Sequence, residues 1–320
     1  MKFDIFFYEA FEEEQVALRR ILPGDIRAGY SAETIQRSGH NAPPASLLSI
    51  RTQSDLPIDW HPAVHGVLAR STGYDHLLPI RERVHAPLLA SLPEYCSRAV
   101  AEQAALLWMA LLRKLPAQQR QWAHFNRDNL TGGENEGRTL LVAGVGRIGH
   151  EVARIGRGLG MRVRGVDITP RHKDIDYVSL EEGIADADVV VSSMNLTPKN
   201  RGIFDYSLLR HAKRGCIFVN VARGELAIIS DLTRLLAEGI LGGVGLDVFN
   251  DEIHVADALR QDSPHPEAER LRSLALNPNV ILTPHNAFNT TEAVWRKADL
   301  SSSQVLHFLQ HGVFAWPLPG

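Results

Sequence analysis

Short apolar runs alternate with amphipathic or polar segments along most of the chain, a pattern typical of strands joined by helices. The pattern is most regular in the second half, where six runs of strand length are separated by helical segments such as residues 207–212 and 229–238. The runs are residues 140–143, 163–166, 189–192, 216–220, 243–246 and 280–282. This alternation predicts a complete doubly wound α/β domain with a parallel sheet.

The first hundred residues show the same alternation on a smaller scale and predict a second, smaller α/β unit with a parallel sheet. Its strands are expected at residues 3–8, 47–50, 67–69 and 87–91. Two helical stripes, residues 94–115 and 291–311, are long enough to connect the two domains. The polar segment 116–137 is expected to be a surface connection, and residues 253–278 an excursion between two strands.

A glycine motif, Gly-Val-Gly-Arg-Ile-Gly, directly follows the first apolar run of the larger domain. Gly144 allows the tight turn from strand to helix, Gly146 lets the backbone approach a pyrophosphate, and Gly149 permits close packing of helix and sheet. Asp167 lies 18 residues beyond Gly149, near the spacing expected for the acid that binds ribose hydroxyls. The glycines alone are weak evidence, but together with strand, helix and acid they predict a nicotinamide cofactor.

Asp167 also bears on the choice of cofactor. Its carboxylate would face the 2′-phosphate of NADP, and like charges near 4 Å repel by on the order of 1 to 4 kcal/mol depending on screening. Arg171 and Lys173 lie just downstream and could offset part of this repulsion. NAD is therefore the expected cofactor, with NADP the less favoured one.

Three later strand ends carry side chains suited to hydride-transfer chemistry, and the ends of parallel strands open on one crevice. His285 is the candidate acid and base, Glu252 the carboxylate that would hold its ring, and Arg223 the guanidinium that would bind a carboxylate or a developing alkoxide. Singly, each residue type is more often structural or solvated. Their joint occurrence downstream of a dinucleotide motif favours catalysis. Arg70, at the end of a strand in the smaller unit, is left open between a substrate-loop residue and an ordinary surface turn.

Four segments, residues 144–149, 220–224, 245–252 and 283–285, resemble in order the signatures of the D-isomer-specific 2-hydroxyacid dehydrogenases. The resemblance implies a Rossmann NAD-binding domain at residues 102–290 and a smaller flavodoxin-like substrate domain at residues 1–101 and 291–320. It implies that Arg223, Glu252 and His285 are catalytic. The implied cofactor contacts are Gly144, Gly146, Arg147, Ile148, Gly149, Asp167, Val221, Ala222 and Asp247, the last close to the nicotinamide.

The resemblance is strongest to the D-lactate dehydrogenase branch, through residues 70–75, 93–102 and 285–288. It implies that backbone amides of Ser71, Thr72 and Gly73 hold the substrate carboxylate, that Tyr95 borders the substrate, and that Phe288 forms a pocket wall. The side chain of the substrate stays open: lactate-like acids, glyoxylate, hydroxypyruvate and branched keto acids are all candidates. The family also implies a homodimer.

Bulk properties fit this interpretation. The 320 residues are 44% hydrophobic and 22% charged, enough for sizeable cores. The net charge of −3 without a basic run argues against nucleic acid or an anionic membrane as partner. Cys96 and Cys216 form neither a disulfide framework nor a zinc spacing, so no metal site is expected. The amino terminus lacks a signal-peptide core, which predicts a cytoplasmic protein.

The predicted activity is NAD-dependent reduction of a small 2-keto acid to the D-2-hydroxy acid. One alternative is an NADH-sensing binding protein on the same scaffold, as in the C-terminal-binding-protein corepressors, which resemble these dehydrogenases. Another is formate or phosphite dehydrogenase. Formate dehydrogenase is similar but has glutamine where Glu252 stands, which counts against it.

Overall fold

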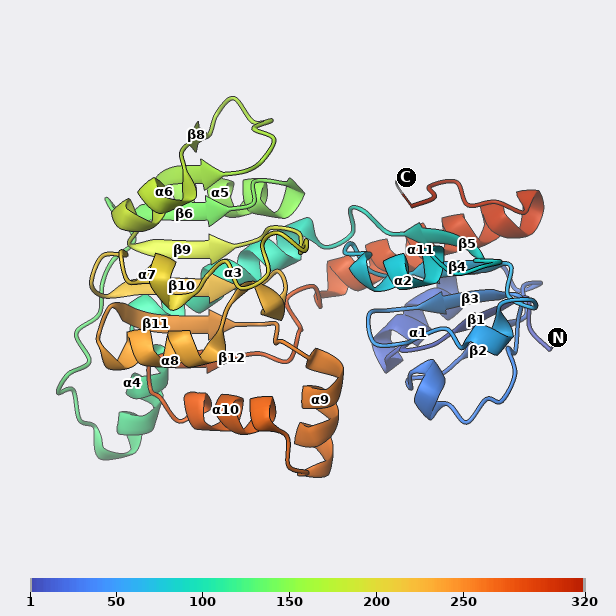
Figure 1. Ribbon diagram of the computed structural model, residues 1–320, viewed down its shortest axis with the longest axis horizontal. Helices are drawn as coiled ribbons and strands as arrows, with labels where there is room; N and C mark the ends of the chain where they lie inside the picture. The colour runs from blue at the N-terminus through green and yellow to red at the C-terminus, as the bar shows by residue number, and fades with distance from the viewer. Residues whose placement is uncertain (1, 319–320) are drawn as a thin grey trace. The chain divides into compact units, whose positions relative to one another are not determined.

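The computed structural model describes residues 2–318, which divide into two compact units (Figure 1). The first comprises Met1–Cys96 and Asn289–Gly320, and the second comprises Ser97–Phe288. Each has a parallel sheet covered by helices, so the predicted α/β class with two doubly wound domains is confirmed.

The sheet of the first unit has, among the described residues, five parallel strands in the order β2-β1-β3-β4-β5, which is the flavodoxin-like order. The strands are β1 Ile5–Phe7, β2 Ala28–Tyr30, β3 Leu47–Ile50, β4 Gly66–Ala69 and β5 Leu88–Ser91. The helices are α1 Glu12–Ile21, α2 Leu78–Arg81 and α11 Thr291–His311, with short 3₁₀ turns η1 Ile35–Arg37, η2 Ile58–Trp60 and η3 Asp75–Leu77. Helix α1 begins with three acids and ends with two arginines, which suits the helix dipole, and it packs against α11.

The sheet of the second unit has, within the described part of the chain, seven parallel strands in the order β12-β11-β10-β9-β6-β7-β8. They are β6 Thr139–Ala143, β7 Arg162–Val166, β8 Asp176–Tyr177, β9 Val189–Ser192, β10 Cys216–Asn220, β11 Leu241–Leu246 and β12 Val280–Leu282. The chain builds outward from β6 to β8, then returns to pair β9 with β6 and builds the other way. The carboxyl ends of β6 and β9 therefore mark the switch point where ligands bind in such sheets.

Helices cover both faces of this sheet (Figure 1). They are α3 Ser97–Leu112, α4 Leu115–Gln121, α5 Arg147–Gly158, α6 Leu180–Asp186, α7 Tyr206–Leu209, α8 Ile229–Ala237, α9 Glu252–Gln261 and α10 Pro266–Ala275, with 3₁₀ turns η4 Trp122–His124 and η5 Gly224–Leu226. Helix α3 packs on β10 and β11 at close range, because a Cβ at Gly245 would lie 3.1 Å from the Leu107 side chain. Both cysteines are buried free thiols.

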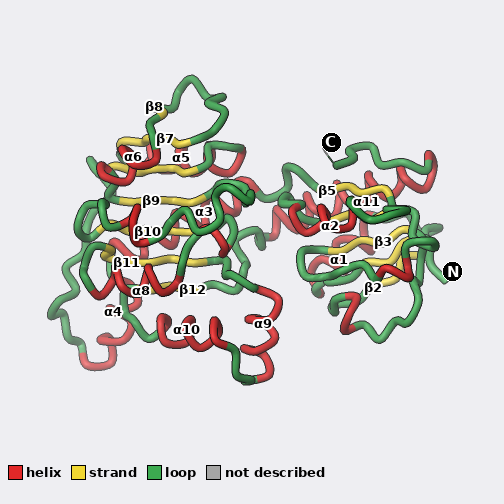
Figure 2. Tube along the Cα trace, in the orientation of Figure 1, coloured by secondary structure: helices red, strands yellow, loops and turns green. Residues whose placement is uncertain are grey.

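The apolar runs located the strands well, and two details differ. Strands β2 and β8 were missed, because they are two or three residues long and have no apolar run of their own. The expected surface connection at 116–137 contains α4 and η4, and the excursion at 253–278 folds largely into α9 and α10. Figure 2 shows the loops that follow β6, β10 and β11 leaving the same end of the sheet. This end carries the candidate site.

Candidate active site

The glycine loop between β6 and α5 has the geometry of a phosphate-binding turn. Gly144 has φ +90°, and a Cβ there would lie 2.5 Å from the Met194 backbone. A Cβ at Gly149 would lie 2.0 Å from the Gly144 carbonyl oxygen, so helix and loop meet at a distance that only glycine allows. Ser193 Oγ donates to the same carbonyl at 2.7 Å and ties β9 to the loop. The sequence indicated the glycines but not Ser193.

The residues present fit the pyrophosphate and ribose of NAD. Gly146 caps the twelve-residue helix α5, and a Cβ on it would meet no described atom within 4 Å, so the space in front of the helix amino terminus is open. Asp167 follows β7 and accepts hydrogen bonds from the backbone N–H groups of Val145 and Thr169, both at 2.8 Å. The acid is thus fixed beside the glycine loop. Of the other predicted contacts in this loop, Arg147 is exposed and Ile148 is half-buried.

His285 and Glu252, 33 residues apart in sequence, form a direct contact. His285 Nδ1 lies 2.7 Å from Glu252 Oε1 and 2.9 Å from Oε2. Glu252 is the first residue of α9, and His285 follows β12 in the left-handed region at φ +50°. Both side chains are about a quarter exposed or less. The Phe288 ring is buried and lies edge-on to the imidazole, with centroids 6.4 Å apart.

Asp247 organises the segment that carries His285. Its carboxylate accepts hydrogen bonds from Thr283 Oγ1 at 2.5 Å and from the backbone N–H groups of Asn286 and Ala287, both at 2.9 Å. The residue is fully buried, and burial raises the pKa of its carboxyl group although these hydrogen bonds oppose the rise. The donors lie on both sides of His285, so Asp247 fixes the backbone that presents the imidazole.

Arg223 lies in a turn after β10 that packs tightly against the turn after β11. Asn220 shapes the turn, because its side-chain amide donates to the Arg223 carbonyl at 2.8 Å and its oxygen accepts from Ala222 N at 3.1 Å. A Cβ at Gly224 would lie 1.8 Å from the Phe249 carbonyl carbon, so glycine is required where the two turns meet. Arg223 Nη1 donates to the Ala222 carbonyl at 2.8 Å. The loops carrying Arg223 and Glu252 are therefore locked together.

Arg70 has neither of the roles that the sequence left open for it. Its side chain is completely buried in the first unit, and its three nitrogens donate inward: Nε to Glu14 Oε1 at 2.8 Å, Nη1 to Ser49 Oγ at 2.9 Å, and Nη2 to the Tyr8 carbonyl at 2.6 Å. It is a core residue that anchors the end of β4. The polar residues after this strand indicated a turn, but the sequence gives no sign that Glu14 of α1 is buried next to Arg70.

Lys297 of α11 completes this buried cluster, with Nζ 3.0 Å from Glu14 Oε1. Burial raises the pKa of Glu14, but the charges of Arg70, Lys297 and Arg51 outweigh it and lower that pKa to about 2. The pKa of Lys297 is lowered to about 7 by burial, which attraction to Glu14 does not offset. Both shifts follow from charge balance. The single carboxylate of Glu14 lies among three cations and is stabilised as an anion, whereas Arg51 and Arg70 disfavour a further positive charge on Lys297.

The predicted substrate residues of the first unit lie around the end of β4 and the residues before Cys96. Ser71 Oγ donates to the Gly73 carbonyl at 2.7 Å, and Thr72 Oγ1 lies 3.5 Å from Cys96 Sγ. Tyr95 is buried, with Lys297 Nζ 5.6 Å from its ring centroid. The roles of these residues toward substrate stay predictions.

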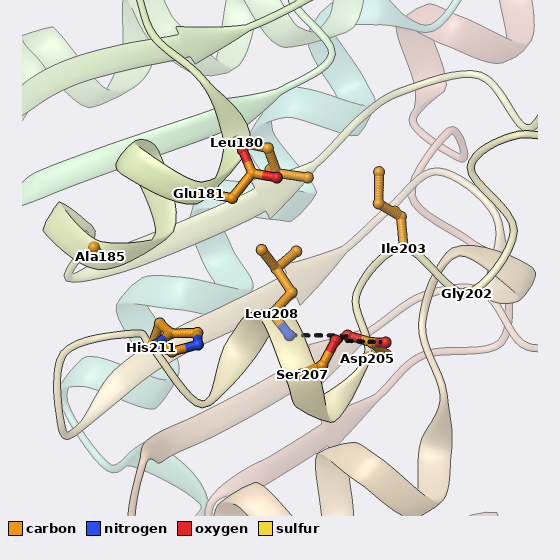
Figure 3. A pocket seen from close by; sticks show the side chains of 9 residues that line it. All are labelled: Leu180, Glu181, Ala185, Gly202, Ile203, Asp205, Ser207, Leu208 and His211. Carbon is orange, nitrogen blue, oxygen red and sulfur yellow. Dashed lines mark hydrogen bonds between the residues drawn. The ribbon is translucent and has the colours of Figure 1, made fainter.

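A separate hollow of about 700 Å³ lies between α6 and α7 in the second unit (Figure 3). Leu180 and Glu181 on one side face Leu208 and His211 on the other, and Asp205 caps α7 by accepting from Leu208 N at 2.9 Å. None of the predicted cofactor, substrate or catalytic residues is among its lining residues. The hollow is therefore distinct from the candidate active site.

A doubly wound sheet with a glycine loop at its switch point and an acid after the next strand is typical of dinucleotide-binding domains. The model of the family "D-isomer specific 2-hydroxyacid dehydrogenase, NAD binding domain" matches residues 105–287. Curated relatives include the D-lactate dehydrogenase of Streptococcus agalactiae serotype V, 32% identical over 239 residues, or 71% of each chain, and that of Staphylococcus epidermidis, 29% identical over 240 residues with the same coverage. The chain therefore belongs to the D-isomer-specific 2-hydroxyacid dehydrogenase family and is an NAD-dependent dehydrogenase.

Solved structures agree with this family assignment. The D-lactate dehydrogenase of Aquifex aeolicus, complexed with NAD and lactic acid, is 25% identical with a TM-score of 0.84 over 97% of this chain and 98% of that one. The apo D-lactate dehydrogenase of Escherichia coli shares the fold, with 23% identity and a TM-score of 0.83 over 98% and 99%. Within residues 2–318, no helix has the length and apolar character needed to cross a membrane.

Proposed function

We propose that this dehydrogenase reduces a small 2-keto acid to the D-2-hydroxy acid, with His285 as the proton donor. The observation that carries the proposal is the contact of His285 Nδ1 with both oxygens of Glu252, at 2.7 and 2.9 Å. The Aquifex aeolicus relative, complexed with NAD and lactic acid, supports a small 2-hydroxy acid as the product. Cytoplasmic location and a homodimer stay predictions.

The carboxylate of Glu252 accepts hydrogen bonds and has none to donate, so Nδ1 of His285 carries a proton and the second proton of the imidazolium sits on Nε2. When bound in the glycine loop, NADH would supply a hydride for the keto carbon. Transfer of the Nε2 proton to the keto oxygen completes the hydroxyl group and leaves a neutral imidazole. Glu252 stabilises the imidazolium before transfer and keeps the ring oriented throughout.

Arg223 is proposed to bind the substrate carboxylate or the developing charge on the keto oxygen, because guanidinium groups form paired hydrogen bonds with such oxygens. Its turn is held against the turn that leads to Glu252. A rigid support of this kind keeps a charged side chain in place without reorganisation during the reaction.

Replacing His285 with glutamine tests the proton donor. We expect kcat to fall by roughly 10²- to 10⁴-fold, the usual contribution of a positioned acid or base, with little change in NADH affinity. His254→Gln is a matched control, because His254 is an exposed histidine of α9 that contacts Asp251 at 2.6 Å. A His285→Gln enzyme that keeps its turnover would overturn the proposal.

Arg223→Lys tests the substrate-binding guanidinium. It should raise KM for the keto acid, and an unchanged KM would exclude the carboxylate-binding role.

Substrate choice is tested with pyruvate, glyoxylate, hydroxypyruvate and branched 2-keto acids, each with NADH and NADPH. Asp167 predicts a preference for NADH, because its carboxylate would repel a 2′-phosphate. Equal kcat/KM with both cofactors would contradict this role of Asp167. Absence of turnover with every 2-keto acid would contradict the proposed reaction.

A further inference from the structure

Two imidazoles and a carboxylate gather beside the glycine loop of the second unit. They belong to His150 on α5 and to His172 and Asp174 in the segment between β7 and β8. One ligand atom from each residue lies within 4.8 Å of the other two. We propose that His150, His172 and Asp174 form a binding site for a divalent transition metal ion of the Zn²⁺ type. The site is separate from His285 and Glu252 and goes beyond the proposed reaction.

The spacing of the side chains suits such an ion. His150 Nε2 lies 3.2 Å from Asp174 Oδ2, and two ligands of a tetrahedral ion with bonds of ~2.0–2.1 Å lie about 3.4 Å apart. The rings of His150 and His172 are 8° from parallel with centroids 3.9 Å apart. A ring nitrogen of His172 lies within 4.8 Å of the other two ligand atoms, so its half-buried ring would have to rotate to bring that nitrogen to the same point. Three protein ligands leave a fourth position for water.

Arg157 fixes the position of the Asp174 carboxylate. It lies two helical turns beyond His150 on α5, its Nη1 is 2.6 Å from Asp174 Oδ2, and its Nη2 donates to the Asp174 carbonyl oxygen. These contacts hold the Asp174 carboxylate beside the two imidazoles, in the place where it can act as a ligand.

The donor set also selects the kind of ion. Two imidazoles favour Zn²⁺, Co²⁺, Ni²⁺ and Cu²⁺ over Mg²⁺ and Ca²⁺, which bind oxygen ligands. The positive charge of Arg157 disfavours any cation, so only ions that bind imidazole strongly overcome it. With half of the Asp174 side chain exposed, the ion can enter directly from solvent.

An ion at this site would connect α5 to the segment that follows Asp167. Residues 168–175 would then be ordered against the helix whose amino terminus faces the cofactor phosphates. The cysteine spacing did not indicate this site, because its ligands are two histidines and an acid, one on α5 and two in the segment after β7.

The test is titration of the chelator-treated full-length protein with ZnCl₂ by calorimetry, with the visible absorption of bound Co²⁺ as a second readout. We expect one ion per chain, and binding at least tenfold weaker in His172→Gln and in Asp174→Asn. His254→Gln is the matched control and should bind as wild type does. His254 and His265 also flank an acid, Asp251, but their rings are 6.5 Å apart.

Three results would overturn the site: no Zn²⁺ binding by wild type, equal affinity in wild type and His172→Gln, or loss of binding in His285→Gln with His172→Gln unaffected. The last would place the ion at the His285–Glu252 pair. NADH binding verifies that each variant is folded. If Asp174→Asn fails that check, His172→Gln carries the test. Amide hydrogen exchange of residues 168–175 should slow with Zn²⁺ in wild type and stay unchanged in His172→Gln.

Discussion

Replacing Asp247 with asparagine tests whether this buried carboxylate positions His285. Asp247 accepts three hydrogen bonds, from Thr283 Oγ1 and from the backbone N–H groups of Asn286 and Ala287. Oδ1 receives two of these bonds and Oδ2 receives the third. An asparagine amide has one oxygen, so in either orientation its NH₂ group faces a backbone N–H that then has no acceptor.

The expected fall in kcat follows from this unsatisfied backbone N–H group. Losing a hydrogen bond to a charged acceptor in a buried site costs about 1.5–3 kcal/mol. The backbone around His285 can move to satisfy this N–H group, which displaces the imidazole. If the transition state then loses the same ~1.5–3 kcal/mol of stabilisation, kcat falls by roughly 10- to 150-fold. Thr283→Val is the matched control, because it removes one hydroxyl donor and leaves both backbone bonds to Asp247. It should lower kcat less than Asp247→Asn does.

Steady-state kinetics with a 2-keto acid, together with NADH affinity and the free energy of unfolding, give the readout. A positioning role predicts a lower kcat with NADH affinity nearly unchanged. Retention of kcat within about twofold would refute the reasoning. A loss confined to NADH affinity would instead support the contact with the nicotinamide that the family resemblance implies for Asp247.

Two further changes, one of them with a control variant, test other features. Lys297→Met removes a buried cation whose pKa falls from 10.5 to about 7 on folding. Between these pH values the unfolded chain holds more protons than the folded one, so the free energy of unfolding of the wild type should rise with pH by up to ~1.4 kcal/mol per unit. Denaturant unfolding at several pH values should show that this slope is lost in the variant. Gly149→Ala should weaken NADH binding more than tenfold, because its Cβ would lie 2.0 Å from Gly144 O. Gly158→Ala, with open space at its Cβ, should stabilise α5 by up to ~1 kcal/mol, and fluorescence titration with NADH separates the two variants.

The linear order of apolar runs and turn residues determined much of this protein. Burial of a parallel strand on both faces leaves a short apolar run, and the tight turn at Gly144 requires a backbone that only glycine adopts easily. Both effects act within a few residues, so β9 and β10 were predicted with their observed bounds. The candidate residues Arg223, Glu252 and His285 could be chosen because each directly follows a predicted strand or its turn.

Tertiary structure alone decided which distant side chains meet. Strand order and register bring Glu252 within 2.7 Å of His285, and they bury Arg70 against Glu14, which lies 56 residues away. The same holds for His150 and Asp174, which lie on different elements. Polar side chains give no periodic signal of their partners, because their pairing depends on how whole elements pack rather than on the local chain.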